Sequence, residues 1–587
     1  MAQACYINWY VISFGCLVNP NKSSQREIIM TPKPALSELP IKLATTGFYR
    51  GFSLDVTVVS KIIISALVVW AIFWPVHAGK ILGDWNTLIL ANFAAWYIWV
   101  IALFVIVCIG LALWPAAGRL NLGQPGEKPE FSNFSWFSMM FSAGIGVGML
   151  TWAVAEPVTH FANNPEVIQG LTTGGAQDNV RMAFKWSFLH WGLSAWACYA
   201  IAGLSMAFFS YRRALPLTIR SSLTPLFGKA LSGPLGHFID IVAVVATILG
   251  VAQTLGFGVE QFVAGLTRIG IGGLVNAQGN ASTFGIIVAL MMIMGASTLS
   301  ALSGVGKGIK WLSNINMILS VILLGFFIIF GATFFGGSAM FLGLWDYLLA
   351  LPQMSFNVWT TDSVQGSEAF LLTQWQGWWP VFYWAWWIAF APFVGLFLAR
   401  ISRGRSIREF VLGAMFVPSL MCFVWFAWAG GTAIDLELNG GANGVIFNAA
   451  NADKIFAMTE FMLAPISEWL AWGMALLIVV LLMTFLVTSA DSAVLIVNTI
   501  NAGGDEGPKA RPHILFWGAA LGLVVAGLLI SGGTAAIKTA MVIGALPFSI
   551  VMVLMCFALV FAIYSDGRRE AAGVQTTFSR KNTLSAE

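Results

Sequence analysis

Apolar segments of about twenty residues recur along most of this chain, with short polar connections between them. An α-helix rises about 1.5 Å per residue, so about 20 apolar residues cross a hydrocarbon core about 30 Å thick. Lipid offers no hydrogen bonds to a backbone, and segments of this length satisfy their own only as helices. We therefore expect an all-α polytopic membrane protein. About twelve spans are predicted, at residues 55–77, 88–114, 134–158, 181–210, 236–266, 283–302, 311–335, 376–400, 410–432, 467–500, 512–531 and 538–564.

The composition argues against several other classes of protein. Hydrophobic residues make up 58% of the chain and charged residues 10%, and the mean hydropathy is +0.81, so the lipid bilayer is the expected partner. The net charge of +4 is spread over short loops, which argues against nucleic-acid binding. The histidines show no metalloprotease spacing, and the chain has no nucleophile elbow or phosphate-binding loop, so we expect no enzyme. A channel would need a continuous polar lining, which these spans lack.

Basic residues mark every second connection between the predicted spans. Because basic loops stay on the cytoplasmic side, we expect both termini in the cytoplasm of a bacterium and the spans in its inner membrane. Residues 1–54 and the tail at 565–587 would then be cytoplasmic, and residues 1–29 are suspected to precede a native start at Met30. The basic residues are Arg119, Lys128, Arg212, Arg213, Arg220, Lys229, Lys307, Lys310, Arg400, Arg403, Arg405, Arg408, Lys509 and Arg511.

Residues 338–356 interrupt the series of spans with an amphipathic pattern. Phe341, Trp345 and Leu349 fall on one side of a helix, and Asp346 lies beside them. Such a helix can lie flat at the membrane interface. An ordinary extracellular loop is the alternative.

Tryptophans crowd the eighth predicted span. Trp and Tyr usually collect at the two headgroup levels, but Trp386 and Trp387 fall half-way along this span. The fourth span offers three more rings within one arc of its helix, Trp191, Trp196 and Tyr199. Ring faces carry negative quadrupole density, so an aromatic-lined cavity attracts quaternary ammonium groups. A transporter of onium compounds is therefore the working hypothesis, and aromatics that only pack or face lipid are the alternative.

Glycines alternate in the middle of the third span, at Gly144, Gly146 and Gly148. Each Gly costs about 1 kcal/mol relative to Ala in a helix, so some other interaction must offset that loss. Close helix packing is one explanation. The other is a discontinuous helix whose free backbone groups face a ligand near the membrane midplane.

Four motifs together resemble the betaine/choline/carnitine transporter family. They are FSAGIGVG at 141–148, AEP at 155–157, FYWAWWIAFAPFVGLFLARISRGRSIREF at 382–410 and FLVTSADS at 485–492. The resemblance covers nearly the whole chain after about Phe48. It implies a leucine-transporter-like core of two five-helix inverted repeats and a homotrimeric assembly. The repeats would occupy residues 134–335 and 376–564, after two peripheral helices at 55–114.

The resemblance further implies a substrate cage of aromatic rings around a trimethylammonium group. The last ring position, usually Trp in the family, is Phe390 here. Choline-type members carry an Asp where this chain has Gly148, and a buried cation without a counter-charge is costly, so a ligand with its own carboxylate is expected. Backbone N–H groups of the third span would meet that carboxylate. The implied substrate-binding residues are Trp191, Trp196, Tyr199, Trp386, Trp387, Phe390, Gly144, Gly146 and Gly148.

These features predict a sodium symporter with alternating access for a zwitterionic onium solute. Glycine betaine is the first expectation, followed by dimethylsulfoniopropionate, carnitine and ectoine. The alternative is a choline or carnitine carrier of the same family that is coupled to protons or works by exchange.

Sodium is the only coupling ion or cofactor that the resemblance implies, and it needs hard oxygen ligands. The fifth span lacks the Arg that sodium-independent exchangers carry, which favours sodium. At a second ion site Val251 replaces a hydroxyl. Asp491 is a functional candidate because it is an acid inside a membrane helix, and the favoured interpretation is that it braces neighbouring helices. Glu156 and His190 are interpreted as structural residues, and a role in carrying protons is the alternative. The implied ligands are Ser142, Ile145, Phe485, Thr488 and Ser489 at the first site, and Thr247, Thr254 and Phe393 at the second.

Overall fold

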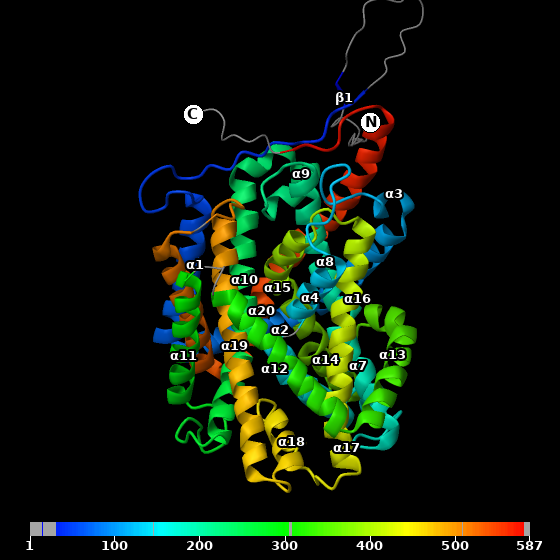
Figure 1. Ribbon diagram of the computed structural model, residues 1–587, viewed down its shortest axis with the longest axis vertical. Helices are drawn as coiled ribbons and strands as arrows, with labels where there is room; N and C mark the ends of the chain where they lie inside the picture. The colour runs from blue at the N-terminus through cyan, green and yellow to red at the C-terminus, as the bar shows by residue number, and fades with distance from the viewer. Residues whose placement is uncertain (1–13, 16–30, 145, 304–307, 508, 580–587) are drawn as a thin grey trace, which may run out of the picture.

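Helices form nearly all of the regular structure in the computed structural model, which describes residues 14–15, 31–144, 146–303, 308–507 and 509–579 (Figure 1). The strands β1 (Phe14–Gly15) and β2 (Thr31–Pro32) have two residues each. The α-helices are α1 (Leu54–Phe73), α2 (Pro75–Leu113), α3 (Pro115–Gly118), α4 (Asn133–Gly144), α5 (Val147–Ala162), α6 (Pro165–Ile168), α7 (Val180–Trp191), α8 (Leu193–Ala207), α9 (Thr224–Phe227), α10 (Pro234–Arg268), α11 (Thr283–Ser303), α12 (Gly308–Phe330), α13 (Thr333–Phe356), α14 (Glu368–Trp378), α15 (Pro380–Ile401), α16 (Ile407–Trp425), α17 (Gly431–Leu438), α18 (Lys454–Leu463), α19 (Glu468–Asn501) and α20 (Arg511–Ala571). The 3₁₀- and π-helical elements are η1 (Gln177–Asn179), η2 (Phe208–Arg212), η3 (Arg220–Leu223), η4 (Gly228–Ser232) and η5 (Phe426–Gly430).

Eleven helical stretches among the described residues are long and apolar enough to cross a membrane. The third predicted span is not one of them, because it is divided into α4 and α5. α20 counts once, although a kink at Gly532 and Gly533 separates the last two predicted spans. Gly533 has a φ of 64°, which glycine adopts without the strain of a Cβ. The eleven stretches also include α13, which was not among the predicted spans. The prediction of an all-α polytopic membrane protein is confirmed.

The third predicted span is discontinuous at its glycines. α4 ends at Gly144 and α5 begins at Val147, and Gly146 between them is extended, with φ −163° and ψ −174°. The prediction of a broken helix is therefore confirmed. No side chain caps the N-terminus of α5, so its first backbone N–H groups keep their capacity to donate.

α13 forms where the sequence predicts an amphipathic helix at 338–356, and it begins earlier, at Thr333. Phe341 and Trp345 are exposed, whereas Tyr347 is fully buried against α7 and α8. The alternative of an ordinary loop is therefore wrong. That the helix lies flat at the membrane interface stays a prediction.

α15 lies at the centre of the molecule and packs against α8, α10 and α20 (Figure 1). A Cβ added to Gly203 of α8 would lie 3.0 Å from the carbonyl oxygen of Gly395, and one on Gly250 of α10 would lie 2.9 Å from the carbonyl carbon of Ala389. Small residues let helix backbones approach this closely. α15 is thus held between two neighbouring helices at backbone contact distance.

The described N-terminal segment and the end of α20 lie at the same end of the molecule (Figure 1). The Arg569 side chain donates to the Lys33 carbonyl at 2.8 Å, and Arg213 pairs with Asp566 at 2.8 Å. The predicted twelve spans, an even number, would likewise place both termini on one side of the membrane. Met30 and nearly all of residues 1–29 lie outside the described residues, and the two inverted repeats stay a prediction.

Candidate functional site

A cavity of about 410 Å³ lies half-way along α15, between α5, α7, α8, α10, α12 and α19. Most of the residues predicted from the sequence line it. They are Gly146, Gly148, Trp191, Trp196, Tyr199, Thr254, Trp386, Trp387, Phe390, Phe393, Phe485, Thr488 and Ser489.

Aromatic rings form one wall of this cavity, and we call the six predicted ring residues, Trp191, Trp196, Tyr199, Trp386, Trp387 and Phe390, the aromatic cage. The Trp386 and Trp387 rings are stacked, with centroids 4.9 Å apart and planes 12° apart. Trp191 stands at 73° to Trp387 with centroids 5.1 Å apart, and Tyr199 stands at 76° to Trp387 at 6.0 Å. Faces and edges of several rings therefore converge on one space, which suits a rounded cation.

The polar edges of the cage rings are bonded to buried protein groups. Trp386 Nε1 donates to Thr254 Oγ1 at 3.2 Å, and Trp387 Nε1 donates to the His190 carbonyl at 2.9 Å. Trp191 Nε1 donates to Glu156 Oε2 at 2.7 Å. These bonds fix the ring orientations before any ligand arrives, so little side-chain entropy is left to lose on binding.

Gly148 lies directly against the cage. A Cβ on this residue would lie 2.9 Å from Trp386 Cη2 and 3.3 Å from Trp191 Cη2. Any side chain here would therefore push on two cage rings. Gly146 and Gly148 line the cavity, and Gly144 ends α4.

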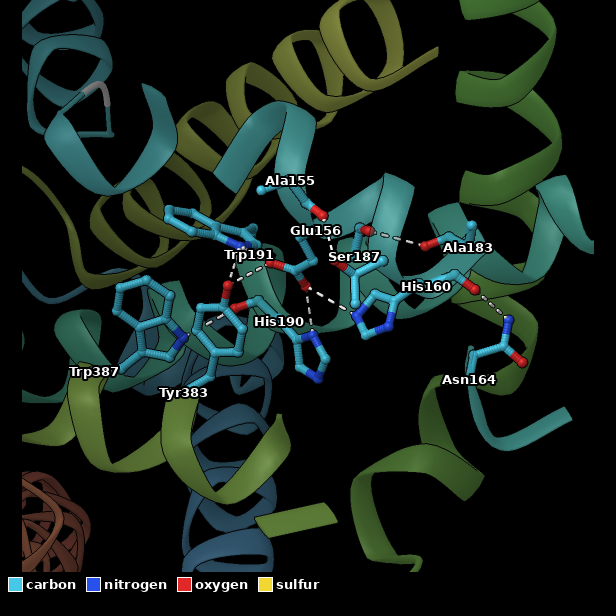
Figure 2. A network of polar contacts seen from close by, with 11 residues as sticks. Ala155, Glu156, His160, Asn164, Ala183, Ser187, His190, Trp191, Tyr383 and Trp387 are labelled. Atoms are coloured by element: carbon cyan, nitrogen blue, oxygen red, sulfur yellow. Dashed lines mark hydrogen bonds and ion pairs between the residues drawn. The ribbon is translucent and has the colours of Figure 1, made fainter. Parts of the chain in front are cut away.

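A buried cluster of Glu156, His160 and His190, which we call the acid–histidine cluster, lies behind Trp191 (Figure 2). Glu156 Oε1 lies 2.7 Å from His190 Nδ1 and 3.4 Å from His160 Nε2. Glu156 Oε2 accepts from Trp191 and from the Tyr383 hydroxyl. All three cluster residues are fully buried. The sequence offered His190 and Glu156 as structural residues but gave no sign of their contact with the cage.

Hydroxyl and carbonyl oxygens lie on the α19 side of the cavity, and we call Phe485, Thr488, Ser489 and Asn316 the hydroxyl corner. Thr488 Oγ1 donates to the Thr484 carbonyl at 2.9 Å and accepts from Asn316 Nδ2 at 3.1 Å. This set of neutral oxygens fits a hard monovalent cation such as sodium. Among the other predicted ligands, Ile145 lies outside the described residues, and Ser142 lies in α4.

Only two of the three residues predicted to bind a second ion line the cavity. Thr254 and Phe393 line the cavity, whereas Thr247 does not. Thr247 is fully buried and donates to the Ala243 carbonyl at 2.7 Å. Thr254 also accepts from Trp386, so its oxygen is already engaged by the cage.

Asp491 follows the hydroxyl corner on α19 and connects α19 to α11. Its Oδ2 accepts from Ser300 Oγ at 2.6 Å, and its Oδ1 from Ser492 Oγ at 3.3 Å. These contacts agree with the predicted role in bracing neighbouring helices.

The cavity extends along α15 toward the end of the molecule where the described N-terminal segment and the end of α20 meet. Its lining continues from the cage through Phe397 to Arg400, which pairs with Glu506. On the opposite side of the cage, Trp379, Tyr383 and the acid–histidine cluster fill the space between α5, α7 and α15. Asn316, Phe397 and Arg400 were not predicted as site residues, because nothing in the local sequence marks which helix face meets the cavity.

Comparison with known families gives one match over most of the chain. The family described as "BCCT, betaine/carnitine/choline family transporter" matches residues 55–568.

Individual relatives agree with this match. The chain is 37% identical over 516 residues to a probable glycine betaine transporter of Desulfitobacterium hafniense (strain Y51), which covers 86% of this chain and 97% of that protein. It is 38% identical over 513 residues to the glycine betaine transporter OpuD of Bacillus subtilis (strain 168), covering 86% and 94%. It is 36% identical over 485 residues to the osmo-independent choline transporter BetT1 of Acinetobacter baylyi (strain ATCC 33305 / BD413 / ADP1), covering 82% and 88%.

Proposed function

The chain belongs to the betaine/carnitine/choline transporter family, and on that basis we propose that it imports glycine betaine or a similar zwitterionic onium solute by sodium symport. It is a multi-pass membrane transporter of betaine or choline type and not an enzyme. The observation that carries the proposal is the aromatic cage, whose buried rings converge on one cavity.

The cage supports a methylated onium head as the substrate group. Each well-placed ring contributes about 2 kcal/mol to the binding free energy of a cation once water is excluded. A quaternary ammonium or sulfonium group carries no N–H donors, so ring faces can bind it without hydrogen-bond acceptors. Glycine betaine and dimethylsulfoniopropionate share this head chemistry.

The N-terminus of α5 supports a ligand that brings its own carboxylate. The N-terminus of α5 begins at Val147, beside the cage, and Gly146 and Gly148 both line the cavity. Helix N-termini favour anions through free N–H groups and the helix dipole. We infer that the carboxylate of the ligand is held there while its head lies among the rings.

The hydroxyl corner supports sodium as the coupling ion. Phe485, Thr488 and Ser489 lie on α19, which packs against α5 and lines the same cavity as the first residues of α5. Sodium held between α5 and α19 would link two elements that both line the substrate cavity, which is one way for ion binding to favour ligand binding. The oxygens would bind and orient the ion, and the ion would supply the positive charge that couples uptake to its gradient.

The direction of the cavity supports an inward-facing state of an alternating-access cycle. The cavity runs toward Arg400, in a basic connection that the positive-inside rule assigns to the cytoplasm. We infer that the cage opens to the other side when the cluster beyond it separates. Cytoplasmic termini and a homotrimeric assembly belong to the same proposal.

Uptake into proteoliposomes tests the proposal. Radiolabelled glycine betaine, dimethylsulfoniopropionate, carnitine and choline would each be supplied with an inward sodium gradient, and again with potassium in place of sodium at fixed pH. We expect saturable uptake with glycine betaine among the preferred substrates, and at least a tenfold loss without sodium. Choline uptake that exceeds betaine uptake, or uptake that follows a proton gradient, would support the alternative of a choline carrier. The similarity to BetT1 favours that alternative.

A further inference from the structure

The acid–histidine cluster is the one buried carboxylate site that contacts the cage rings among the described residues. Glu156 Oε2 accepts from the cage residue Trp191 and from Tyr383, whose hydroxyl lies 3.3 Å from Trp191 Nε1. The Tyr383 ring is stacked with Trp387, with centroids 5.5 Å apart and planes 26° apart. His190 supplies the carbonyl that accepts from Trp387 Nε1. The Trp191 and Trp387 rings of the cage are thus both tied to the acid–histidine cluster (Figure 2).

The hydrogen bonds around Glu156 suit its ionised form. Trp191 Nε1 can only donate, the Tyr383 hydroxyl donates to the same oxygen, and His190 Nδ1 faces the other oxygen. Several donors directed at one carboxyl group favour its charged form. These bonds replace the water that the carboxylate lost on burial.

The same geometry indicates that the two histidines are neutral. His190 Nε2 and His160 Nδ1 are buried and have no hydrogen-bond partner among the described residues. A second proton on either ring would create a buried N–H without an acceptor, whereas a neutral ring leaves only a bare acceptor nitrogen there. Tyr383, His160 and His190 are the titratable groups that face Glu156 from α15, α5 and α7. With Glu156 ionised and both histidines neutral, the cluster would carry one net negative charge.

A buried negative charge without a cationic partner is costly. No lysine or arginine pairs with Glu156 in the part of the chain that the structure describes. An onium head in the cage would bring the missing positive charge, with the Trp191 ring between it and the carboxylate. An indole whose N–H is bonded to a carboxylate also presents a more electron-rich face to a cation.

We propose that Glu156 is a specificity-determining residue, whose buried carboxylate is the counter-charge for the cationic head of the substrate and holds Trp191 and Tyr383 in place. The inference rests on the proposed function, because it presupposes that the cage binds an onium head. It also deepens that function, since Gly148 leaves the cage without a charged side chain of its own and Glu156 provides one from behind the rings.

Two variants separate charge from shape. Glu156→Gln keeps the size and one acceptor oxygen but removes the charge, whereas Glu156→Asp keeps the charge and shortens the side chain. Binding of glycine betaine to purified full-length protein would be measured by isothermal titration calorimetry. If the charge matters, Glu156→Gln weakens binding at least tenfold and Glu156→Asp by about threefold. If Glu156 only supports the ring positions, Glu156→Asp is the weaker binder, and the inference is wrong.

A neutral ligand adds a second readout. In 3,3-dimethylbutanoate a carbon replaces the nitrogen of glycine betaine, so the shape stays and the positive charge is lost. We expect Glu156→Gln to change its affinity by less than twofold; an equal loss for both ligands would overturn the inference. Where its binding is too weak to measure, the order of the Gln and Asp variants decides alone.

Two controls complete the design. Glu260→Gln neutralises an acid on α10 outside the cavity lining and is expected to leave betaine affinity within twofold. Wild-type protein that binds no glycine betaine would contradict the proposed function itself. Wild-type binding with the reverse order of the Glu156 variants would contradict only the role of Glu156.

Discussion

The aromatic cage and the hydroxyl corner line one cavity, but they are built differently. In the cage, the indole N–H groups of Trp191, Trp386 and Trp387 all donate to buried protein acceptors. In the hydroxyl corner, Thr488 bonds back to its own helix, and the buried Asn316 Oδ1 has no partner among the described residues. The cage is therefore preformed, whereas the corner keeps oxygen capacity that an added cation can use. A ligand would lose little order in the cage, and an ion would complete the corner.

Removing the two stacked rings of the cage is expected to have the largest effect. At about 2 kcal/mol per ring, the double variant Trp386→Leu/Trp387→Leu would lose about 4 kcal/mol, or roughly a thousandfold in betaine affinity. Calorimetric titration with glycine betaine measures the loss. Trp469→Leu/Trp472→Leu removes two exposed rings from α19 and provides the matched control, expected to stay within twofold. Equal behaviour of the two double variants would mean that the stacked rings do not bind the substrate.

Adding one methyl group at Gly148, directly against the cage, is expected to have the next largest effect. Gly148→Ala would place a Cβ 2.9 Å from Trp386 Cη2, so the ring must move or the substrate must. Overpacking costs about 1–3 kcal/mol, and we expect about a thirtyfold loss of betaine affinity. Gly83→Ala on α2, where an added Cβ meets nothing within 4 Å, is the control. An unchanged affinity in Gly148→Ala would show that the cage is less rigid than its hydrogen bonds indicate.

Removing one hydroxyl group tests the hydroxyl corner. Thr488→Val keeps the shape of the side chain and removes one oxygen from the hydroxyl corner, so the sodium concentration for half-maximal uptake is expected to rise about tenfold. Thr459→Val on α18 removes a hydroxyl that donates to the Ile455 carbonyl at 2.9 Å outside the cavity lining, and should shift this sodium concentration by less than twofold. Sodium-dependent uptake in proteoliposomes compares the two. Similar shifts in both variants would contradict the placement of sodium in the corner.

The smallest expected effect concerns a single bond that fixes a ring. Thr254→Val leaves Trp386 Nε1 without its acceptor at 3.2 Å. A neutral hydrogen bond contributes about 1 kcal/mol, so betaine affinity should fall about threefold to fivefold, with sodium dependence unchanged. A change in sodium dependence instead would assign Thr254 to an ion site, as the family resemblance suggests.

Sequence reasoning placed the cage and the helix break because both depend on local patterns. Two adjacent tryptophans in the middle of an apolar span and alternating glycines in another are visible without a fold. The division of the last two spans also followed from local signals, and Gly532 and Gly533 mark it in the structure.

Contacts between distant segments could not be predicted in the same way. Glu156 and Tyr383 are 227 residues apart in the chain, and their bond depends on how α5 packs near α15. Asn316 resembles any polar residue of a span until α12 is placed beside α19. The π-helical turn η5, which brings Phe426 within 5.2 Å of Trp191, has no sequence signal that distinguishes it from ordinary helix.

The glycine contacts of α15 limit how the protein can move. Gly203 and Gly250 bring the backbones of α8 and α10 so near to α15 that no side-chain layer separates them. No flexible side chains lie between these backbones, so sliding α15 past either neighbour would bring backbone atoms too close together. Any exchange of access between the two sides must therefore carry these three helices as one rigid body, with the hinges elsewhere, at places such as the extended Gly146.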